Sequence, residues 1–214
     1  MSQAIDQRYS KLAEQACCLS CGRPLDRVAP LPGQVCVDLG SGRGHALLRL
    51  AEAVGPEGRA YGVDLAAGMI EQARRTADKL GIRNATFLRS TFEQIDLPDG
   101  VADWVVSNCS LNHAADKQAV WREIHRILKP GGHFVVSDIY AAEEIPERWR
   151  TDPAAIAECW AGAVVRDRYL GQVAGAGLTD VEVVAETDPY DKGHARVASF
   201  TLTGRKPGMV EGRQ

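Results

Sequence analysis

Short apolar runs alternate with amphipathic segments along the central part of the chain. The apolar runs predict strands at 35–39, 58–63, 84–89, 102–107 and 132–138. Between them, apolar residues recur every three to four positions, which predicts helices at about 43–54, 67–80 and 115–128. This alternation is typical of a parallel sheet with right-handed crossovers and helices on both faces.

The pattern loosens after Asp138. A helix is predicted at 153–163, and Asp167 is placed to cap another that runs to Gly175–Gly177. Two further apolar runs, at 181–184 and 197–203, are joined by a polar loop and should pair antiparallel, because no helix separates them. The predicted fold class is therefore α/β: a Rossmann-like, seven-stranded, mostly parallel sheet with an antiparallel last strand.

The composition is that of an ordinary globular protein. The 214 residues are 45% hydrophobic and 25% charged, so we expect one sizeable core. A net charge of -3 argues against a nucleic-acid partner. No apolar stretch approaches the roughly 20 residues of a membrane helix, and the start lacks a signal-peptide core. We expect a cytoplasmic protein with no membrane partner, whose six cysteines are reduced thiols.

The first predicted strand ends in a glycine-rich turn, Asp38-Leu-Gly40-Ser41-Gly42-Arg-Gly44. Glycines let the backbone turn sharply and approach a ligand closely. The spacing is not the dinucleotide fingerprint, since His45 stands where its third glycine would fall, and no Lys-Ser/Thr follows for a P-loop. An acid two residues before the first glycine suits a cationic ligand.

This turn, with Asp64 closing the next strand, resembles the cofactor site of class I S-adenosylmethionine-dependent methyltransferases. The resemblance implies that the glycine loop passes under the aminoacyl part of the cofactor and that Asp64 accepts hydrogen bonds from its ribose. Ligands of such sheets bind outside the carboxyl ends of the strands. The implied cofactor residues are Asp38, Gly40, Ser41, Gly42, Gly44, Asp64, Leu65, Met69, Thr91, Phe92 and Asn108. Thr91 stands where many relatives carry an acid.

Two short sequence motifs that contain cysteines make the resemblance more specific. Ser107-Asn-Cys109-Ser-Leu-Asn112 and Glu158-Cys159-Trp-Ala-Gly-Ala163 are similar to phrases of the arsenite methyltransferase family, whose members also carry N-terminal cysteines. The resemblance implies that Cys109 and Cys159 hold trivalent arsenic, the substrate. It also implies that Cys17 and Cys18 take part in binding or reduction, with Cys18 as a third ligand.

The implied chemistry is consistent with soft-ligand preferences. Trivalent arsenic prefers thiolates, and its lone pair needs no general base to attack a sulfonium methyl group. Methylation oxidises the arsenic, so a cysteine pair closing into a disulfide would reduce it again, and glutathione or thioredoxin would reset the enzyme. We thus expect S-adenosylmethionine as cofactor, S-adenosylhomocysteine as product and a thiol reductant as partner.

The domain organisation follows from these assignments. We expect residues 1–30 to form a helical, cysteine-bearing lid, residues 31–205 the methyltransferase domain, and residues 206–214 a disordered tail. Many of the larger arsenic enzymes carry a further C-terminal domain, whereas this sequence stops soon after the last predicted strand.

Other interpretations remain open. The cysteines at 109 and 159 could be packing residues in a methyltransferase for a small metabolite such as a quinone precursor. The chain could also be a thiol-based arsenic-binding protein without turnover. The run Cys17-Cys18-x-x-Cys21 could belong to a zinc site, although no fourth ligand at matching spacing is visible. Cys36 alternates with strand valines and is expected in the core, and His113 is the one histidine expected near the site.

Overall fold

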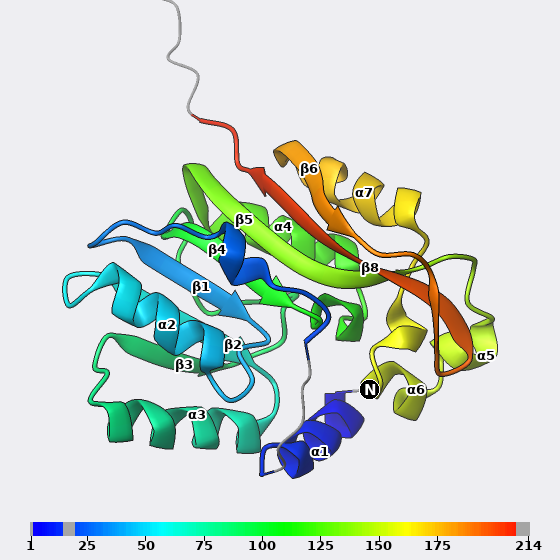
Figure 1. The fold of residues 1–214 in the computed structure, drawn as a ribbon, viewed down its shortest axis with the longest axis horizontal. Helices are drawn as coiled ribbons and strands as arrows, with labels where there is room; N and C mark the ends of the chain where they lie inside the picture. Colours follow the sequence, from blue (N-terminus) through cyan, green and yellow to red (C-terminus); the bar gives the residue numbers. More distant parts are fainter. Residues whose placement is uncertain (1, 15–19, 209–214) are drawn as a thin grey trace, which may run out of the picture.

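A single twisted sheet forms the centre of the computed structural model, which describes residues 2–14 and 20–208 (Figure 1). Its spatial order is β3-β2-β1-β4-β5-β8-β6, with β7 paired to β8. The strands are β1 (Val35–Leu39), β2 (Arg59–Asp64), β3 (Ala85–Arg89), β4 (Ala102–Asn108), β5 (Leu128–Ala141), β6 (Thr179–Glu186), β7 (Tyr190–Lys192) and β8 (Ala195–Arg205). β1 to β5 run parallel, and β8 lies antiparallel to β5, β6 and β7. The predicted fold class is confirmed, and β7 adds a short strand in a segment expected to be a loop.

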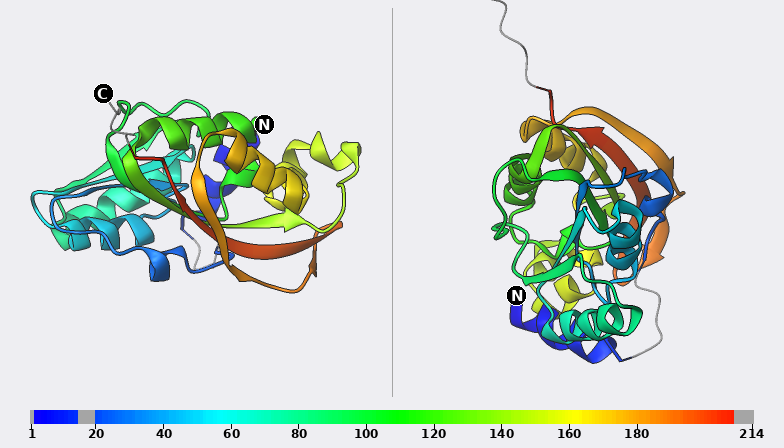
Figure 2. Two further views of the ribbon diagram at one scale, coloured as in Figure 1. Left: turned by 90° about the horizontal axis from the view of Figure 1, so that it is seen from above. Right: turned by 90° about the vertical axis from the view of Figure 1, so that its left-hand side faces the viewer.

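Helices pack on both faces of the sheet (Figures 1 and 2). The helices are α1 (Ser2–Leu12), α2 (His45–Val54), α3 (Ala67–Leu80), α4 (Lys117–Ile127), α5 (Glu147–Arg150), α6 (Pro153–Ala157) and α7 (Arg166–Gly175). Within the described residues, the short 3₁₀ turns are η1 (Pro24–Arg27), η2 (Leu111–His113) and η3 (Trp160–Gly162). One apolar cluster joins α2 and α3 to β2 and β3, and a larger one joins α4 and α7 to the strands on the other face.

Local sequence explains where these helices begin and end. α3 buries the face with Met69 and Ile70 and stops at Gly81, whose φ of 71° is the left-handed conformation that glycine adopts without strain. α4 begins after Asp116, whose carboxylate accepts a hydrogen bond from the Ala119 amide at 3.0 Å. Asp167 does not cap α7 as predicted, because the helix begins one residue earlier and Val165 occupies the capping position.

The predicted helix at 153–163 is wrong in its second half. α6 ends at Ala157, and the chain then turns at Cys159 into η3. The break places Cys159 at a corner between two short elements rather than on a continuous helical face.

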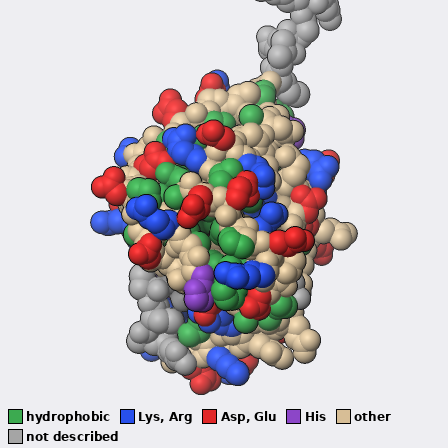
Figure 3. Space-filling model, turned by 90° about the vertical axis from the view of Figure 1, so that its right-hand side faces the viewer, with side chains coloured by type: hydrophobic (Ala, Val, Ile, Leu, Met, Phe, Trp, Pro, Cys, Tyr) green, Lys and Arg blue, Asp and Glu red, His purple; other side chains and the backbone are tan. Residues whose placement is uncertain are grey.

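Charged side chains of both signs are interspersed over the face shown in Figure 3. Among residues 2–14 and 20–208, no helix combines the length and the apolar character needed to cross a membrane. Of the expected tail, residues 206–208 follow β8, and the rest lies outside the described residues.

Candidate active site

A cavity of about 320 Å³ opens at the carboxyl ends of β1, β2 and β4. Most of the predicted cofactor residues line it: Gly40, Gly42, Asp64, Leu65, Met69, Thr91, Phe92 and Asn108. Asp38, Ser41 and Gly44 do not line it, since Asp38 and Ser41 are buried and Gly44 caps α2. The volume is within the range of small-molecule sites, roughly 300 to 1,000 Å³.

The glycine loop forms one wall of the cavity and is fixed by Asp64. One carboxylate oxygen of Asp64 accepts the Gly42 amide proton at 2.8 Å, and the other accepts that of Ala66 at 2.8 Å. Gly40 has a φ of 76°, and a Cβ there would lie 1.9 Å from the Ser110 hydroxyl oxygen. The turn therefore requires glycine at this position, both for its conformation and for the close approach of Ser110.

Asp38 is a buried acid with an unsatisfied oxygen. Its side chain is 3% exposed, and its Oδ2 has no hydrogen-bond partner among the described residues. Burial, together with the nearby charge of Asp64, raises the pKa of Asp38 to about 7. A buried, unpartnered carboxylate oxygen beneath a glycine cradle suits a ligand that is cationic or rich in donors.

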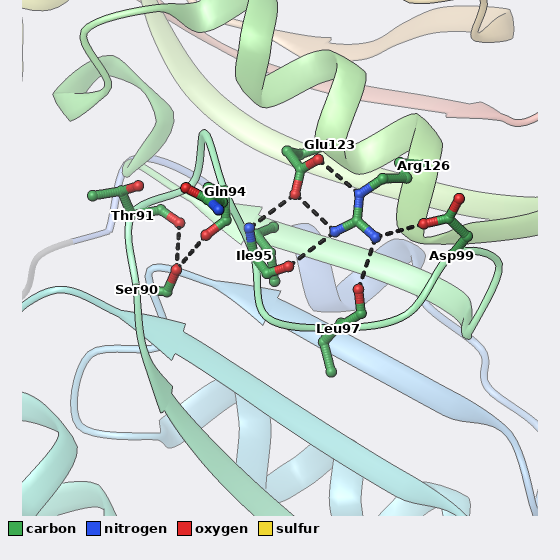
Figure 4. Close-up of polar contacts among 8 residues, drawn as sticks. All are labelled: Ser90, Thr91, Gln94, Ile95, Leu97, Asp99, Glu123 and Arg126. Carbon is green, nitrogen blue, oxygen red and sulfur yellow. Dashed lines mark hydrogen bonds and ion pairs between the residues drawn. The ribbon is translucent and has the colours of Figure 1, made fainter.

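The loop that carries Thr91 and Phe92 is braced from α4 (Figure 4). The Arg126 guanidinium donates to the carbonyl oxygens of Leu97 at 2.7 Å and Ile95 at 2.9 Å. Glu123 accepts the Ile95 amide proton at 2.8 Å and pairs with Arg126 at 2.7 Å. These bonds fix the part of the loop that directly follows its cavity-lining residues.

Helix α1 lies over the cavity, and Ser2, Ile5 and Tyr9 line it. The Tyr9 hydroxyl lies 2.9 Å from Nε2 of His113, and Nδ1 of His113 lies 3.0 Å from the Ile156 carbonyl oxygen. Burial lowers the pKa of His113 to about 4, so the ring is neutral near pH 7. Nδ1 then carries the proton donated to Ile156, and Nε2 accepts the Tyr9 hydroxyl proton.

Side chains of α1 also bond to the start of α3. Asp6 accepts the Ala67 amide proton at 3.0 Å and pairs with Arg89 at 2.9 Å, while the Ser10 hydroxyl accepts the Gly68 amide proton at 3.0 Å. These bonds satisfy helix-terminal donors that no residue of α3 itself caps. The sequence did not single out Asp6 or Tyr9, because their partners lie far along the chain.

Two of the predicted arsenic ligands converge beside the cavity. The sulfurs of Cys109, after β4, and Cys159, after α6, lie 3.9 Å apart. Cys109 lines the cavity, whereas Cys159 is buried behind it. Cys17 and Cys18 lie outside the described residues.

Cys21 joins this pair, which the sequence did not predict. Its sulfur lies 3.7 Å from the Ser137 carbonyl oxygen and 3.8 Å from Oδ1 of Asn108. Ligand atoms of Cys21, Cys109 and Asp138 all lie within 4.8 Å of one another. The only signal for Cys21 in the sequence was its membership of the N-terminal cysteine run.

Both converging cysteines occupy strained backbone positions. Cys109 has a φ of 57° and Cys159 a φ of 75°; among the described residues Asp180 is the only other non-glycine residue with positive φ. Cys159 stands after the end of α6, where glycine is the usual residue. Such positions cost about 1–3 kcal/mol and cluster at functional sites.

The pKa values of the three thiols shift in opposite directions. Side-chain hydrogen bonding with Cys159 and Cys21 lowers the pKa of Cys109, whereas the pKa values of those two neighbours are raised. The half-buried Lys192 adds a favourable positive charge. One thiolate flanked by two thiols is a suitable starting state for a soft electrophile that binds sulfur stepwise.

The open sheet with an antiparallel last strand, together with a cavity walled by a glycine loop and an acid, defines a class I S-adenosylmethionine-dependent methyltransferase fold. Residues 31–192 match the methyltransferase domain family, and the chain belongs to that family.

Among its relatives, an arsenite methyltransferase from Halobacterium salinarum is 34% identical over 199 residues, covering 88% of this chain and 51% of the relative. One from Aquipseudomonas alcaligenes is 36% identical over 168 residues, covering 74% of this chain and 49% of the relative. The crystal structure of an arsenic(III) S-adenosylmethionine methyltransferase from Chlamydomonas reinhardtii superimposes with a TM-score of 0.69 at 28% identity, covering 99% of this chain and 75% of that one. The chain spans about half the length of these two curated relatives.

Proposed function

We propose that the chain is an S-adenosylmethionine-dependent methyltransferase whose substrate is trivalent arsenic held by cysteine thiolates. The observation that carries this proposal is the 3.9 Å separation of the Cys109 and Cys159 sulfurs beside the cofactor-type cavity. The names of the relatives support the same substrate. A third thiolate is available from Cys21, while the predicted ligand Cys18 remains a prediction.

The chain's own residues have distinct tasks in this proposal. When the cofactor is bound, Asp64 would accept hydrogen bonds from its ribose hydroxyls and the glycine loop would hold its aminoacyl group. The unpartnered Oδ2 of the buried Asp38 would be a further acceptor behind the loop. When bound, S-adenosylmethionine would supply an electrophilic methyl group to the arsenic lone pair; as the As–C bond formed, the S–C bond would break to a neutral thioether and arsenic would become pentavalent. Positioning and exclusion of water account for the rate, because no proton has to be removed from the nucleophile.

The N-terminal helix is proposed to be a lid over this site. α1 contacts the cofactor side of the cavity through Asp6 and Ser10 at the start of α3. It contacts the thiol side through Tyr9 on His113 and through an ion pair of Arg8 with Glu158 at 3.3 Å. One helix therefore bridges both halves of the site, so its opening would expose cofactor and acceptor together.

Continued turnover requires a reductant, which we propose is a thiol such as glutathione or thioredoxin. Returning pentavalent arsenic to the trivalent state takes two electrons, which two thiolates supply by forming a disulfide. The external thiol then reduces that disulfide. A reducing compartment such as the cytoplasm suits this cycle.

The test is S-adenosylhomocysteine formation with and without arsenite, in the presence of glutathione. Arsenite should stimulate it in the wild type, whereas Cys109→Ala and Cys159→Ala should each lose about 100-fold or more, since removing one thiolate leaves an incomplete ligand set. Cys36→Ala is the matched control, because Cys36 is buried in a separate apolar cluster. Cofactor affinity should stay near the wild-type value in all three variants.

Two outcomes would contradict the proposal. Arsenite-independent turnover of a small organic acceptor, unaffected by Cys159→Ala, would identify a small-metabolite methyltransferase. Tight arsenite binding without any S-adenosylhomocysteine would identify an arsenic-binding protein without turnover.

A further inference from the structure

A buried carboxylate stands beside the thiols and has no task in arsenic chemistry. Asp138, on β5, is fully buried, and its ligand atom lies within 4.8 Å of the sulfurs of Cys21 and Cys109. Trivalent arsenic is satisfied by sulfur alone, because its three bonds and lone pair leave no position for a carboxylate oxygen. Two sulfurs and one oxygen are instead a donor set for a borderline-soft divalent cation.

Neighbouring groups hold this carboxylate in a fixed orientation. Its Oδ1 accepts the Asn112 side-chain amide proton at 3.0 Å and the Ile139 backbone proton at 2.9 Å. Its Oδ2 accepts the Tyr169 hydroxyl proton at 3.2 Å. Supporting hydrogen bonds of this kind orient ligating carboxylates in metal sites and leave a lone pair on Oδ2 for a cation.

The spacing of the donors favours a divalent cation over a packing role. In a tetrahedral site with Zn–S bonds of about 2.3 Å, two sulfurs lie about 3.8 Å apart, and a sulfur and an oxygen lie somewhat closer. From separations within 4.8 Å, the two sulfurs need to approach by about 1 Å at most, and each sulfur and the Asp138 oxygen by about 1.3 Å at most. Cys159 lies 3.9 Å from Cys109 but outside this mutually close group.

The local charge is compatible with the site. Two thiolates and one carboxylate carry one negative charge more than a divalent cation neutralises. Lys117 is buried close enough to Asp138 to interact with its charge, and the half-buried Lys192 interacts with Cys21 and Cys109. These two cations offset the excess negative charge in a region of low dielectric constant.

We propose that Cys21, Cys109 and Asp138 bind a divalent cation of the Zn²⁺ and Cd²⁺ class, with the fourth position open to water from the cavity that Cys109 lines. Cys109 belongs to this set and to the thiol pair with Cys159, so the cation and trivalent arsenic exclude each other. Divalent soft metals thereby inhibit any reaction that uses the thiol pair. The inference does not depend on arsenic being the physiological substrate.

The experiment separates the two ligand sets with one variant each, using Cd²⁺ alone as the probe on the reduced full chain. Binding is followed by the ultraviolet thiolate-to-cadmium charge-transfer band, and arsenite binding is measured separately. Asp138→Asn should weaken Cd²⁺ binding by about tenfold or more and leave arsenite binding unchanged. Cys159→Ala should weaken arsenite binding and leave Cd²⁺ binding unchanged. Asp191→Asn is the matched control, since it makes the same chemical change at an exposed carboxylate that does not belong to the proposed ligand set.

The coordination itself is read by cadmium NMR of the wild type, whose chemical shift distinguishes sulfur-only from mixed sulfur and oxygen ligands. A set of two sulfurs with oxygen ligands supports the proposal even if Asp138→Asn fails to fold, whereas three sulfurs with one oxygen overturn it, because water at the open position would then be the oxygen ligand. A sulfur-only set overturns it, as does unchanged Cd²⁺ affinity in folded Asp138→Asn. Neither result bears on whether arsenite is methylated, so the two proposals fail independently.

Discussion

Replacing Cys109 by glycine should give a more stable protein than replacing it by alanine. At most positions the alanine variant is the more stable one. Cys109 is held at a φ of 57° by its position between β4 and η2 and by the bond from its amide to the Ser137 carbonyl oxygen at 2.8 Å. An L-residue pays about 1–2 kcal/mol in this conformation, whereas glycine adopts it freely. Both variants lose the same thiol and its contacts, so the comparison isolates the strain.

The expected difference is small but measurable. At an unstrained site alanine is favoured over glycine by about 0.4–1 kcal/mol, because glycine has more freedom in the unfolded chain. Relief of strain outweighs this term at Cys109 and leaves Cys109→Gly ahead by about 1 kcal/mol. For a chain of this length that corresponds to roughly 2–4 °C in Tm.

The assay is thermal and urea unfolding of both variants, followed by circular dichroism. Gly171, in α7, provides the control: nothing lies within 4 Å of a Cβ built there, so Gly171→Ala should be stabilising by about 1 kcal/mol at most. If the free energy of unfolding of Cys109→Ala equals or exceeds that of Cys109→Gly, the strain argument is refuted, because the positive φ of Cys109 then carries no measurable cost.

Further predictions concern the support of the site, its response to pH and its lid. Gly162→Ala should lose about 1–3 kcal/mol of stability, because its Cβ would lie 1.9 Å from the Asn112 carbonyl oxygen; a free energy of unfolding no lower than that of the wild type would contradict this. Since burial lowers the pKa of His113 from 6.5 to about 4, the unfolded chain takes up its proton first, and stability should fall as pH drops from about 6.5 to 4; urea unfolding at several pH values should show a flatter profile in His113→Gln. Asp6→Ala removes a bond that anchors α1 to α3, so stopped-flow release of S-adenosylhomocysteine should accelerate by about 2- to 30-fold, and an unchanged rate would argue against the lid.

Local signals in the sequence determined the sheet, the glycine loop and the place of Asp64 at the cavity. Strands such as 35–39 are buried on both faces, so their apolar runs identify them without tertiary information. The turn after Asp38 requires glycine for steric reasons that act within a few residues, and parallel strands necessarily bring their carboxyl ends to one edge. The same logic placed Cys109 at the cavity, since it directly follows β4.

Only the tertiary structure decided which distant groups meet. The sequence run around Cys17, Cys18 and Cys21 does not indicate which sulfur reaches Cys109, because that depends on the path of the chain across the sheet. The contact of Tyr9 with His113 likewise joins residues 104 positions apart. Asp138 meets the sulfur of Cys109, which directly follows another strand, and that of Cys21, from the N-terminal segment. The turn at Cys159 overrode the helical pattern of 153–163 because packing of Trp160 and Ala161 outweighs local propensity there. The periodicity of apolar residues reflects only local conformational preferences. Contacts between distant residues depend on how the whole core packs.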